Sequence, residues 1–210
     1  FKITKIAIPA RMRRWLFLLF IAYRKLIMKK MLIATLFATI STSVLAEPTV
    51  FKMELGKTTE TDVKEMYNLE PEGVNKYSKG NQYFIDPTQL DLEDLKSTLI
   101  IFDEKGVLVF VGSEFNSISS IEDSKNRYKK FDYLYKILAS KYKLVKKERP
   151  FVGDQYAKFK DGNSEIELSE PHMGGFKINL TYAKKEFLDA FKKIQSEDKK
   201  QKTKDEASSL

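Results

Sequence analysis

Polar and apolar residues alternate along several stretches of the chain, most clearly in residues 155–168, QYAKFKDGNSEIEL. A period of two sends successive side chains to opposite faces of a β-strand, so this stretch predicts two strands joined at Gly162-Asn163. One register satisfies two apolar pairs and two ion pairs: Phe159 with Ile166, Ala157 with Leu168, Lys160 with Glu165, and Lys158 with Glu167. A shift of one residue would mix the two faces, so the pattern predicts this register alone.

Four other stretches carry strand signals. Residues 97–115 hold two β-rich apolar runs around a turn at 103–106, which predicts a hairpin near the centre of a sheet. Residues 176–182 alternate cleanly, and residues 143–147 indicate a short strand. In residues 75–86, the Gly80-Asn81 pair predicts a two-residue turn that sets Tyr77 opposite Phe84.

Three stretches repeat their apolar residues every three to four positions, as amphipathic helices do. Thr59 and Asp62 predict a capping box at the start of a short helix, a longer helix covers 121–141 after a Ser120 cap, and a last helix covers 184–195. The chain therefore predicts the α+β class, with an antiparallel β-sheet of hairpins and about three helices packed on one face. Each half pairs a helix with a Gly-Asn hairpin, which leaves an ancient duplication open.

The first 46 residues have the composition of an export leader. Residues 28–46, MKKMLIATLFATISTSVLA, combine a basic start, an apolar run and a small-residue end, which predicts a signal peptide cleaved between Ala46 and Glu47. Residues 1–27 are then best interpreted as translated sequence upstream of Met28, and an extended targeting peptide is the alternative. The remaining chain predicts a single α+β domain over 47–195 and a disordered polar tail over 196–210.

Removal of the leader changes the charge of the protein. The full chain carries 37 Lys and Arg against 29 Asp and Glu, and the leader holds nine basic and no acidic residues. The remainder has 37 − 9 = 28 basic and 29 acidic residues, a net charge near −1. The cationic signature expected of a nucleic-acid partner or an anionic membrane surface is lost, and no transmembrane span is expected in the processed form.

The side chains of common catalytic and metal sites are scarce. The chain has no cysteine, so it forms no disulfide, and Glu47 stands where a lipoprotein would carry its lipid-modified cysteine. His172, the one histidine, lies in a Pro- and Gly-flanked loop, and the acidic cluster Asp86, Asp91, Glu93 and Asp94 lacks the glycine of a calcium loop. We therefore expect no catalytic residue, no cofactor and no metal, and hence no enzyme. Tyr133 and Tyr156 fall on predicted outer faces and are the candidate interface residues.

Residues 51–67, FKMELGKTTETDVKEMY, resemble the start of small envelope proteins of the SmpA/OmlA outer-membrane-assembly type. The resemblance implies a strand, a glycine and a threonine-rich cap leading into a short helix before an antiparallel sheet. Related helix-plus-sheet modules, arranged in tandem, form the fold of the β-lactamase inhibitor protein. The lipid-bearing cysteine of the envelope family has no counterpart in this chain.

The patterns together favour a small exported protein, periplasmic or secreted, that acts as a protein-interaction or envelope-accessory module. Its expected partner is another envelope or secreted protein, with no nucleic acid and no lipid anchor. Two alternatives remain: a carrier of a small apolar ligand held between helix and sheet, and a hydrolase that uses carboxylates.

Overall fold

The structure is a computed structural model, and it describes residues 46–116, 124–172 and 177–208. The chain divides into two compact units, Phe1–Val44 and Leu45–Leu210, and every described residue belongs to the second unit. Residues 28–45 of the predicted signal peptide therefore lie outside the described residues. The predicted Ser120 cap and Phe176 also lie outside them. Within the described part, no helix is both long enough and apolar enough to cross a membrane.

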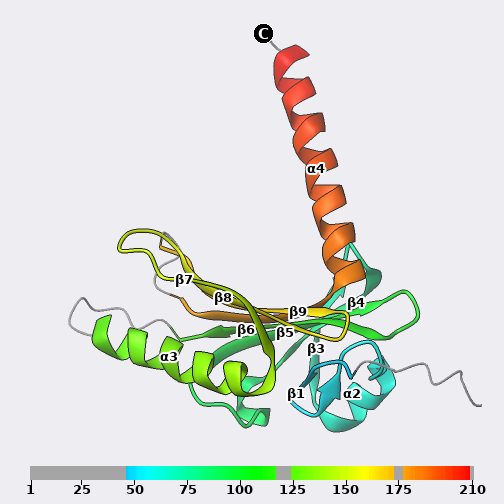
Figure 1. Cartoon of the computed structure of the whole chain (residues 1–210). Helices are drawn as coiled ribbons and strands as arrows, with labels where there is room; N and C mark the ends of the chain where they lie inside the picture. The colour runs from blue at the N-terminus through cyan, green and yellow to red at the C-terminus, as the bar shows by residue number, and fades with distance from the viewer. Residues whose placement is uncertain (1–45, 117–123, 173–176, 209–210) are drawn as a thin grey trace, which may run out of the picture. The chain divides into compact units, whose positions relative to one another are not determined.

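The second unit is built on an eight-stranded antiparallel sheet (Figure 1). Its first half contains β1 (Thr49–Val50), β2 (Met53–Glu54), α2 (Glu60–Met66), β3 (Leu69–Val74), β4 (Lys79–Ile85), the 3-10 helix η1 (Pro87–Gln89), β5 (Leu95–Asp103) and β6 (Leu108–Phe115). Its second half contains α3 (Ser124–Lys141), β7 (Lys143–Glu148), β8 (Gln155–Asp161), β9 (Ser164–Glu170), β10 (Asn179–Lys184) and α4 (Lys185–Ser208). The predicted α+β class with a sheet of hairpins is confirmed.

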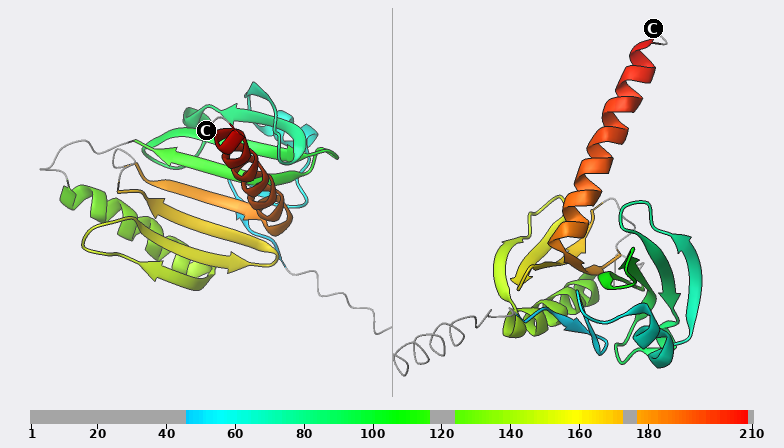
Figure 2. Two further views of the ribbon diagram at one scale, coloured as in Figure 1. Left: turned by 90° about the horizontal axis from the view of Figure 1, so that it is seen from above. Right: turned by 90° about the vertical axis from the view of Figure 1, so that its right-hand side faces the viewer.

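Each half contains a helix followed by four strands of the large sheet, α2 with β3–β6 and α3 with β7–β10, whereas β1, β2, η1 and α4 have no counterpart in the other half. The sheet order β3-β4-β5-β6-β10-β9-β8-β7 joins the two four-stranded meanders along their last strands, so β3 and β7 form the two edges (Figure 2). The two Gly-Asn pairs are not equivalent, because Gly80 lies at the start of β4 and Gly162 follows the end of β8. The repeated topology agrees with a duplication, whereas the repeated dipeptide gives it no support.

The hairpin formed by β8 and β9 has the predicted register. All four predicted pairs lie opposite one another: Phe159 and Ile166, Ala157 and Leu168, Lys160 and Glu165, and Lys158 and Glu167. The apolar pairs are buried, and Lys158 Nζ lies 2.9 Å from a Glu167 carboxylate oxygen. The capping box at α2 is also confirmed, since Asp62 accepts from the backbone N–H of Thr59 at 2.8 Å and the Thr59 hydroxyl accepts from the N–H of Asp62 at 3.3 Å.

The predicted turn at Gly80-Asn81 is wrong, since both residues belong to β4 and Phe84 lies opposite Glu70 rather than Tyr77. The chain turns earlier, where the Asn75 side chain accepts from the backbone N–H groups of Tyr77 and Ser78 at 2.9 and 3.1 Å.

A close approach between strands explains why glycine occupies position 80. A Cβ atom at Gly80 would lie 2.2 Å from the backbone oxygen of Asp103 and 2.3 Å from that of Phe102. The glycine therefore allows β5 to pass close to β4 and has no part in a turn.

The main core lies between the sheet and the layer that contains α2, α3 and the β1–β2 hairpin. Its largest fully buried side chains are Phe102, Phe115, Phe131 and Phe159. Because alternate strand residues face opposite sides, Ile101 faces away from this core and packs with Ala183 and Phe187. Helix α4, which follows β10 directly, therefore begins against the opposite face and runs away from the sheet (Figure 1).

The end of α4 differs from the sequence-based expectation. Residues 196–208, for which composition predicts a disordered tail, continue α4 to Ser208. Side-chain contacts one turn apart accompany this extension, between Gln201 and Asp205 at 2.7 Å and between Lys202 and Glu206 at 3.8 Å. Each such contact adds only about 0.2–0.5 kcal/mol to a helix, so the extension depends on continuity with the packed first turns.

Candidate functional site

The two candidate interface tyrosines lie on opposite sides of the sheet. Tyr133 is 55% exposed on α3, on the side of the helix turned away from the buried Phe131 and Leu134. Tyr156 alternates with the buried Gln155 and Ala157 of β8, so it faces away from α3. The structure does not bring the two tyrosines onto one surface.

Tyr156 is half-buried and flanked by charge. The ammonium groups of Lys146 and Lys158 each lie 5.4 Å from its ring centre. A partner would therefore meet this ring together with two lysines rather than as an isolated aromatic contact.

The acidic cluster does not assemble into a metal site. Asp86 caps η1 by accepting from the N–H of Thr88 at 2.9 Å, and Asp94 pairs with Lys130 at 2.9 Å. Among the described residues, no group of three or more His, Asp or Glu side chains is arranged to hold a metal ion. His172 is exposed, and its backbone N–H donates to Asp154 at 2.7 Å.

Most of the exposed large apolar side chains of the described residues belong to α3, to β7 or to the loop after β7, and Tyr133 lies apart from the others, beside Leu92. Of the eight large apolar side chains that are exposed in the described residues, six lie on α3, on β7 or in the loop after β7: Tyr128, Tyr133, Leu144, Val145, Phe151 and Val152. We call these six residues the α3–β7 edge. Phe151 is fully exposed at the tip of the loop, and grouped exposure of this kind is typical of contact surfaces.

A polar network fastens the loop of the α3–β7 edge to the fold. The Arg149 guanidinium forms a two-point ion pair with Asp132 of α3, and its Nε donates to the Gln155 side chain at 2.6 Å. Gln155 in turn donates to the buried Glu170 of β9. The hydrogen bonds from Arg149 hold the pKa of Asp132 below its ordinary value, so the carboxylate stays charged and the network stays paired.

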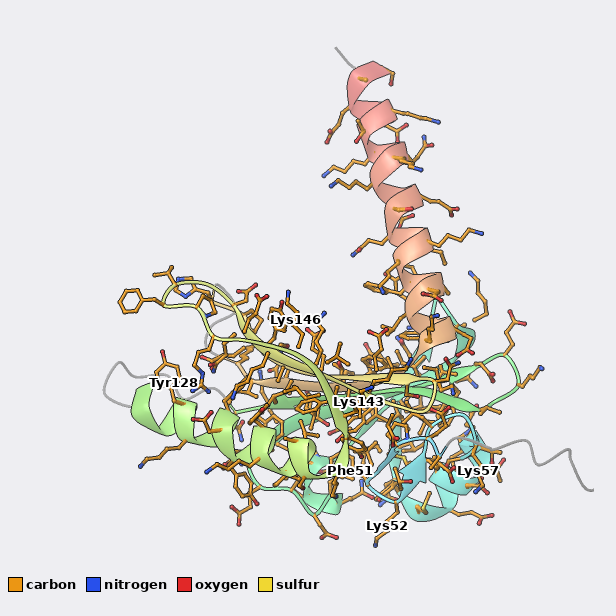
Figure 3. All side chains as sticks on the ribbon, viewed as in Figure 1. Phe51, Lys52, Lys57, Tyr128, Lys143 and Lys146 are labelled. Carbon is orange, nitrogen blue, oxygen red and sulfur yellow. The ribbon has the colours of Figure 1, made fainter. Side chains whose placement is uncertain are left out.

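This network forms the wall of a small open pocket of about 120 Å³. Tyr128 and Phe151 lie at the pocket with Arg149, Glu170 and His172. The Arg149 guanidinium carbon lies 5.6 Å from the Tyr128 ring centre, so the first described part of α3 and the loop after β7 meet there (Figure 3). The pocket has room for one small side chain or a few waters, and two residues of the α3–β7 edge, Tyr128 and Phe151, line it.

The face of β7 and β8 turned away from α3 is rich in lysine. Lys143 lies directly opposite Lys160, and Lys146 lies directly opposite Lys158. Lys146 pairs with Glu148 at 2.5 Å and Lys158 pairs with Glu167 at 2.9 Å. Lys143 and Lys160 have no ion pair among the described residues, so two like charges face each other at the start of β7. We call these four lysines the lysine face.

Glu47, the residue that follows the predicted cleavage point, is anchored to the second half of the fold. Its carboxylate accepts from Lys184 at 2.7 Å, from the Ser164 hydroxyl at 2.6 Å and from the Asn163 backbone N–H at 3.0 Å. Burial raises the pKa of Glu47, but the hydrogen bonds from Lys184, Ser164 and Asn163 outweigh it and leave the pKa below its ordinary value. The packed unit thus begins beside the predicted processing point.

Of the six residues of the α3–β7 edge, sequence reasoning named Tyr133 and missed the other five. Phe151 and Val152 stand between Pro150 and Gly153, where an apolar pair has no strand or helix periodicity to place it in a core. The lack of periodicity around Phe151 and Val152 is the one sequence feature that could have indicated their exposure. No sequence feature indicates the ion pair between Arg149 and Asp132, because it depends on packing α3 beside the end of β7.

Comparison of the chain with protein-family models, with curated proteins and with solved structures gave no match. The resemblance of residues 51–67 to SmpA/OmlA-type envelope proteins therefore stays a prediction, and no site residue is transferred from it.

Proposed function

We propose that this chain is an exported protein-interaction module, periplasmic or secreted, that binds another envelope or secreted protein through the α3–β7 edge. The observation that carries the proposal is that six of the eight exposed large apolar side chains of the described residues belong to this edge, with Phe151 and Val152 in its loop. Burying one exposed Val or Phe side chain against a partner contributes about 1.5–3 kcal/mol. Several such side chains buried together would form the apolar centre that protein interfaces have within a polar rim.

The fixed position of the loop supports the proposal. Arg149 holds the start of the loop to Asp132 and Gln155, so Phe151 projects from a braced segment rather than a free one. A side chain that is already positioned loses less conformational entropy on binding, which favours affinity.

Export is the second part of the proposal. The boundary between the two compact units falls after Val44, two residues before the predicted cleavage point. Glu47 begins the anchored part of the fold through its contact with Lys184. Processing at that point would leave the packed unit intact, and N-terminal sequencing of the exported protein should return Glu47 as the first residue.

A pair of valines at the two sheet edges offers a matched test. Val152 is 67% exposed after edge strand β7, and Val74 is 65% exposed at the end of edge strand β3. A photo-crosslinking amino acid placed at position 152 in exporting cells should give an adduct of one discrete mass. The same probe at position 74 should give none. Equal adducts from both positions, or adducts from position 74 alone, would contradict the proposal.

A further inference from the structure

We infer that β7 accepts an extended acidic segment of the partner protein as an additional strand of the sheet, with acidic side chains on the lysine face. The inference rests on the proposed function, because it names the chemistry of the partner and one way in which it pairs. It is carried by three observations: an open sheet edge, a lysine on that edge, Lys143, that has no ion pair among the described residues, and an exposed leucine on the other face of the same strand.

The edge of β7 is open to pairing. β7 is the last strand in the sheet order, and all six of its residues are exposed. An edge strand presents a row of backbone N–H and C=O groups, and extended peptides bind proteins by completing such a row. The other edge strand, β3, contains Pro71, which has no backbone N–H to donate and makes β3 a poorer template. Each edge strand has one irregularity of register, between Pro71 and Gly73 in β3 and between Leu144 and Lys146 in β7.

The charges on β7 select the sign of the partner. Lys143 faces Lys160 across the two strands and has no ion pair among the described residues. Glu165 lies opposite Lys160 on its other side, and Lys146 and Lys158 each pair with a glutamate, so in the described part of the chain Lys143 is the lysine of this face with neither an ion pair nor a carboxylate opposite it. The Cβ atoms of directly opposite residues on neighbouring strands lie about 4.5–5.5 Å apart, so the carboxylate of a Glu on an added strand would be within reach of Lys143. An acidic segment would thus place a carboxylate beside Lys143, whereas a basic segment would add a like charge there.

The register also predicts the pattern of the added strand. Leu144 pairs with the buried Phe159, so it points to the face that carries α3, and it is still 41% exposed. Lys143 and Lys146 of β7 lie opposite lysines of β8 in the strand register, on the face of the sheet turned away from α3. The partner segment should therefore place acidic residues toward the lysine face and apolar residues over Leu144. The register of β7 shifts between Leu144 and Lys146, which is why Lys143 and Lys146 share a face although they are three residues apart.

The test measures binding of a fluorescent peptide to the purified exported protein. The peptide has six residues, the length of β7, with alternating valine and glutamate. A peptide of alternating valine and lysine is the charge control. Two further peptides carry methyl groups on alternate backbone amides, one for each edge of the peptide. Methylation on the edge that faces β7 should abolish binding and methylation on the other edge should leave it unchanged, because only one edge enters the ladder.

A matched pair of double variants isolates the lysine face (Figure 3). Lys143→Glu with Lys146→Glu should weaken binding of the acidic peptide about tenfold or more and create binding of the basic peptide. Lys52→Glu with Lys57→Glu makes the same change of net charge elsewhere, and Lys57, like Lys146, pairs with a nearby glutamate, Glu54. This control should change binding by about twofold or less.

Three outcomes would overturn the inference: no binding of the acidic peptide, equal loss in the two double variants, or no effect of methylation on either edge. If the position-152 probe still gives its adduct in those cases, the interaction module stands without the added strand. If the peptide binds as expected while position 152 gives no adduct, the strand pairing stands and the proposed role of the α3–β7 edge fails.

Discussion

The contact between Glu47 and Lys184 gives a stability prediction that can be worked out from the structure. The two side chains are 15% and 14% exposed and lie 2.7 Å apart, and Glu47 also accepts from Ser164 and Asn163. Glu47→Gln removes the charge but keeps one acceptor oxygen. Fully exposed ion pairs contribute about 0.2–1 kcal/mol, and hydrogen bonds to charged groups about 1.5–3 kcal/mol. This partly shielded pair lies between those limits, so we expect a loss of about 1–2 kcal/mol in the free energy of unfolding.

The assay is urea unfolding of the wild type, Glu47→Gln, Lys184→Met and the double variant, combined in a double-mutant cycle. The coupling energy should be about 1 kcal/mol, and the melting temperature of Glu47→Gln should fall by about 2–8 °C. The slope of the free energy against urea should not change. A coupling energy near zero would refute the reasoning, because it would mean that the two groups do not stabilise each other in solution.

The same pair predicts a dependence on pH. The folded-state pKa of Glu47 lies below its ordinary value, so its contribution is fully present above that ordinary value, about 4.3. The contribution is lost as the pH falls through the lower, folded-state pKa. The difference in stability between wild type and Glu47→Gln should therefore stay constant from pH 7 to about 5 and shrink in stronger acid. A difference that grows in acid would contradict the assignment.

Three further predictions concern backbone geometry. Phe51 and Lys52 both have positive φ, at 48° and 62°, a region that glycine adopts more readily than other residues. Urea unfolding should therefore show that Lys52→Gly stabilises the protein by about 0.5–1 kcal/mol and that Lys52→Ala changes its stability little. Gly80→Ala should destabilise by about 2–3 kcal/mol, because its Cβ meets the backbone of Phe102 and Asp103, which cannot yield. Gly112→Ala should lower the free energy of unfolding by less, because the nearest neighbour of its Cβ is the rotatable ring of Phe110, at 2.7 Å. A larger loss for Gly112→Ala than for Gly80→Ala would contradict this reasoning.

The sequence predicts the parts of this fold that depend on local pattern. The hairpin of β8 and β9 follows from alternation and charge pairing over 14 residues, and its register is the predicted one. The turn near Gly80 could not be predicted, because the requirement for glycine comes from Asp103 in another strand. The length of α4 was missed because its polar composition resembles that of a disordered tail.

The candidate site was harder to predict than the fold, because its parts meet only after folding. Tyr133 and Tyr156 were chosen from outward-facing positions, and the sheet separates them. The brace between Asp132 and Arg149, and the anchor between Glu47 and Lys184, join residues whose proximity no periodic pattern encodes. Surface sites of this kind follow from tertiary contacts rather than from motifs.

The most direct test of the interaction module is the mass of the particle that the exported protein forms in the cell extract. The wild type should migrate in a complex heavier than one chain, and Phe151→Ser with Val152→Ser should return it to the mass of one chain. Met66→Ser with Val74→Ser, which removes two exposed apolar side chains outside the α3–β7 edge, should keep the heavier complex. A wild-type protein that migrates as one chain, or a complex that survives the loss of Phe151 and Val152, would contradict the account.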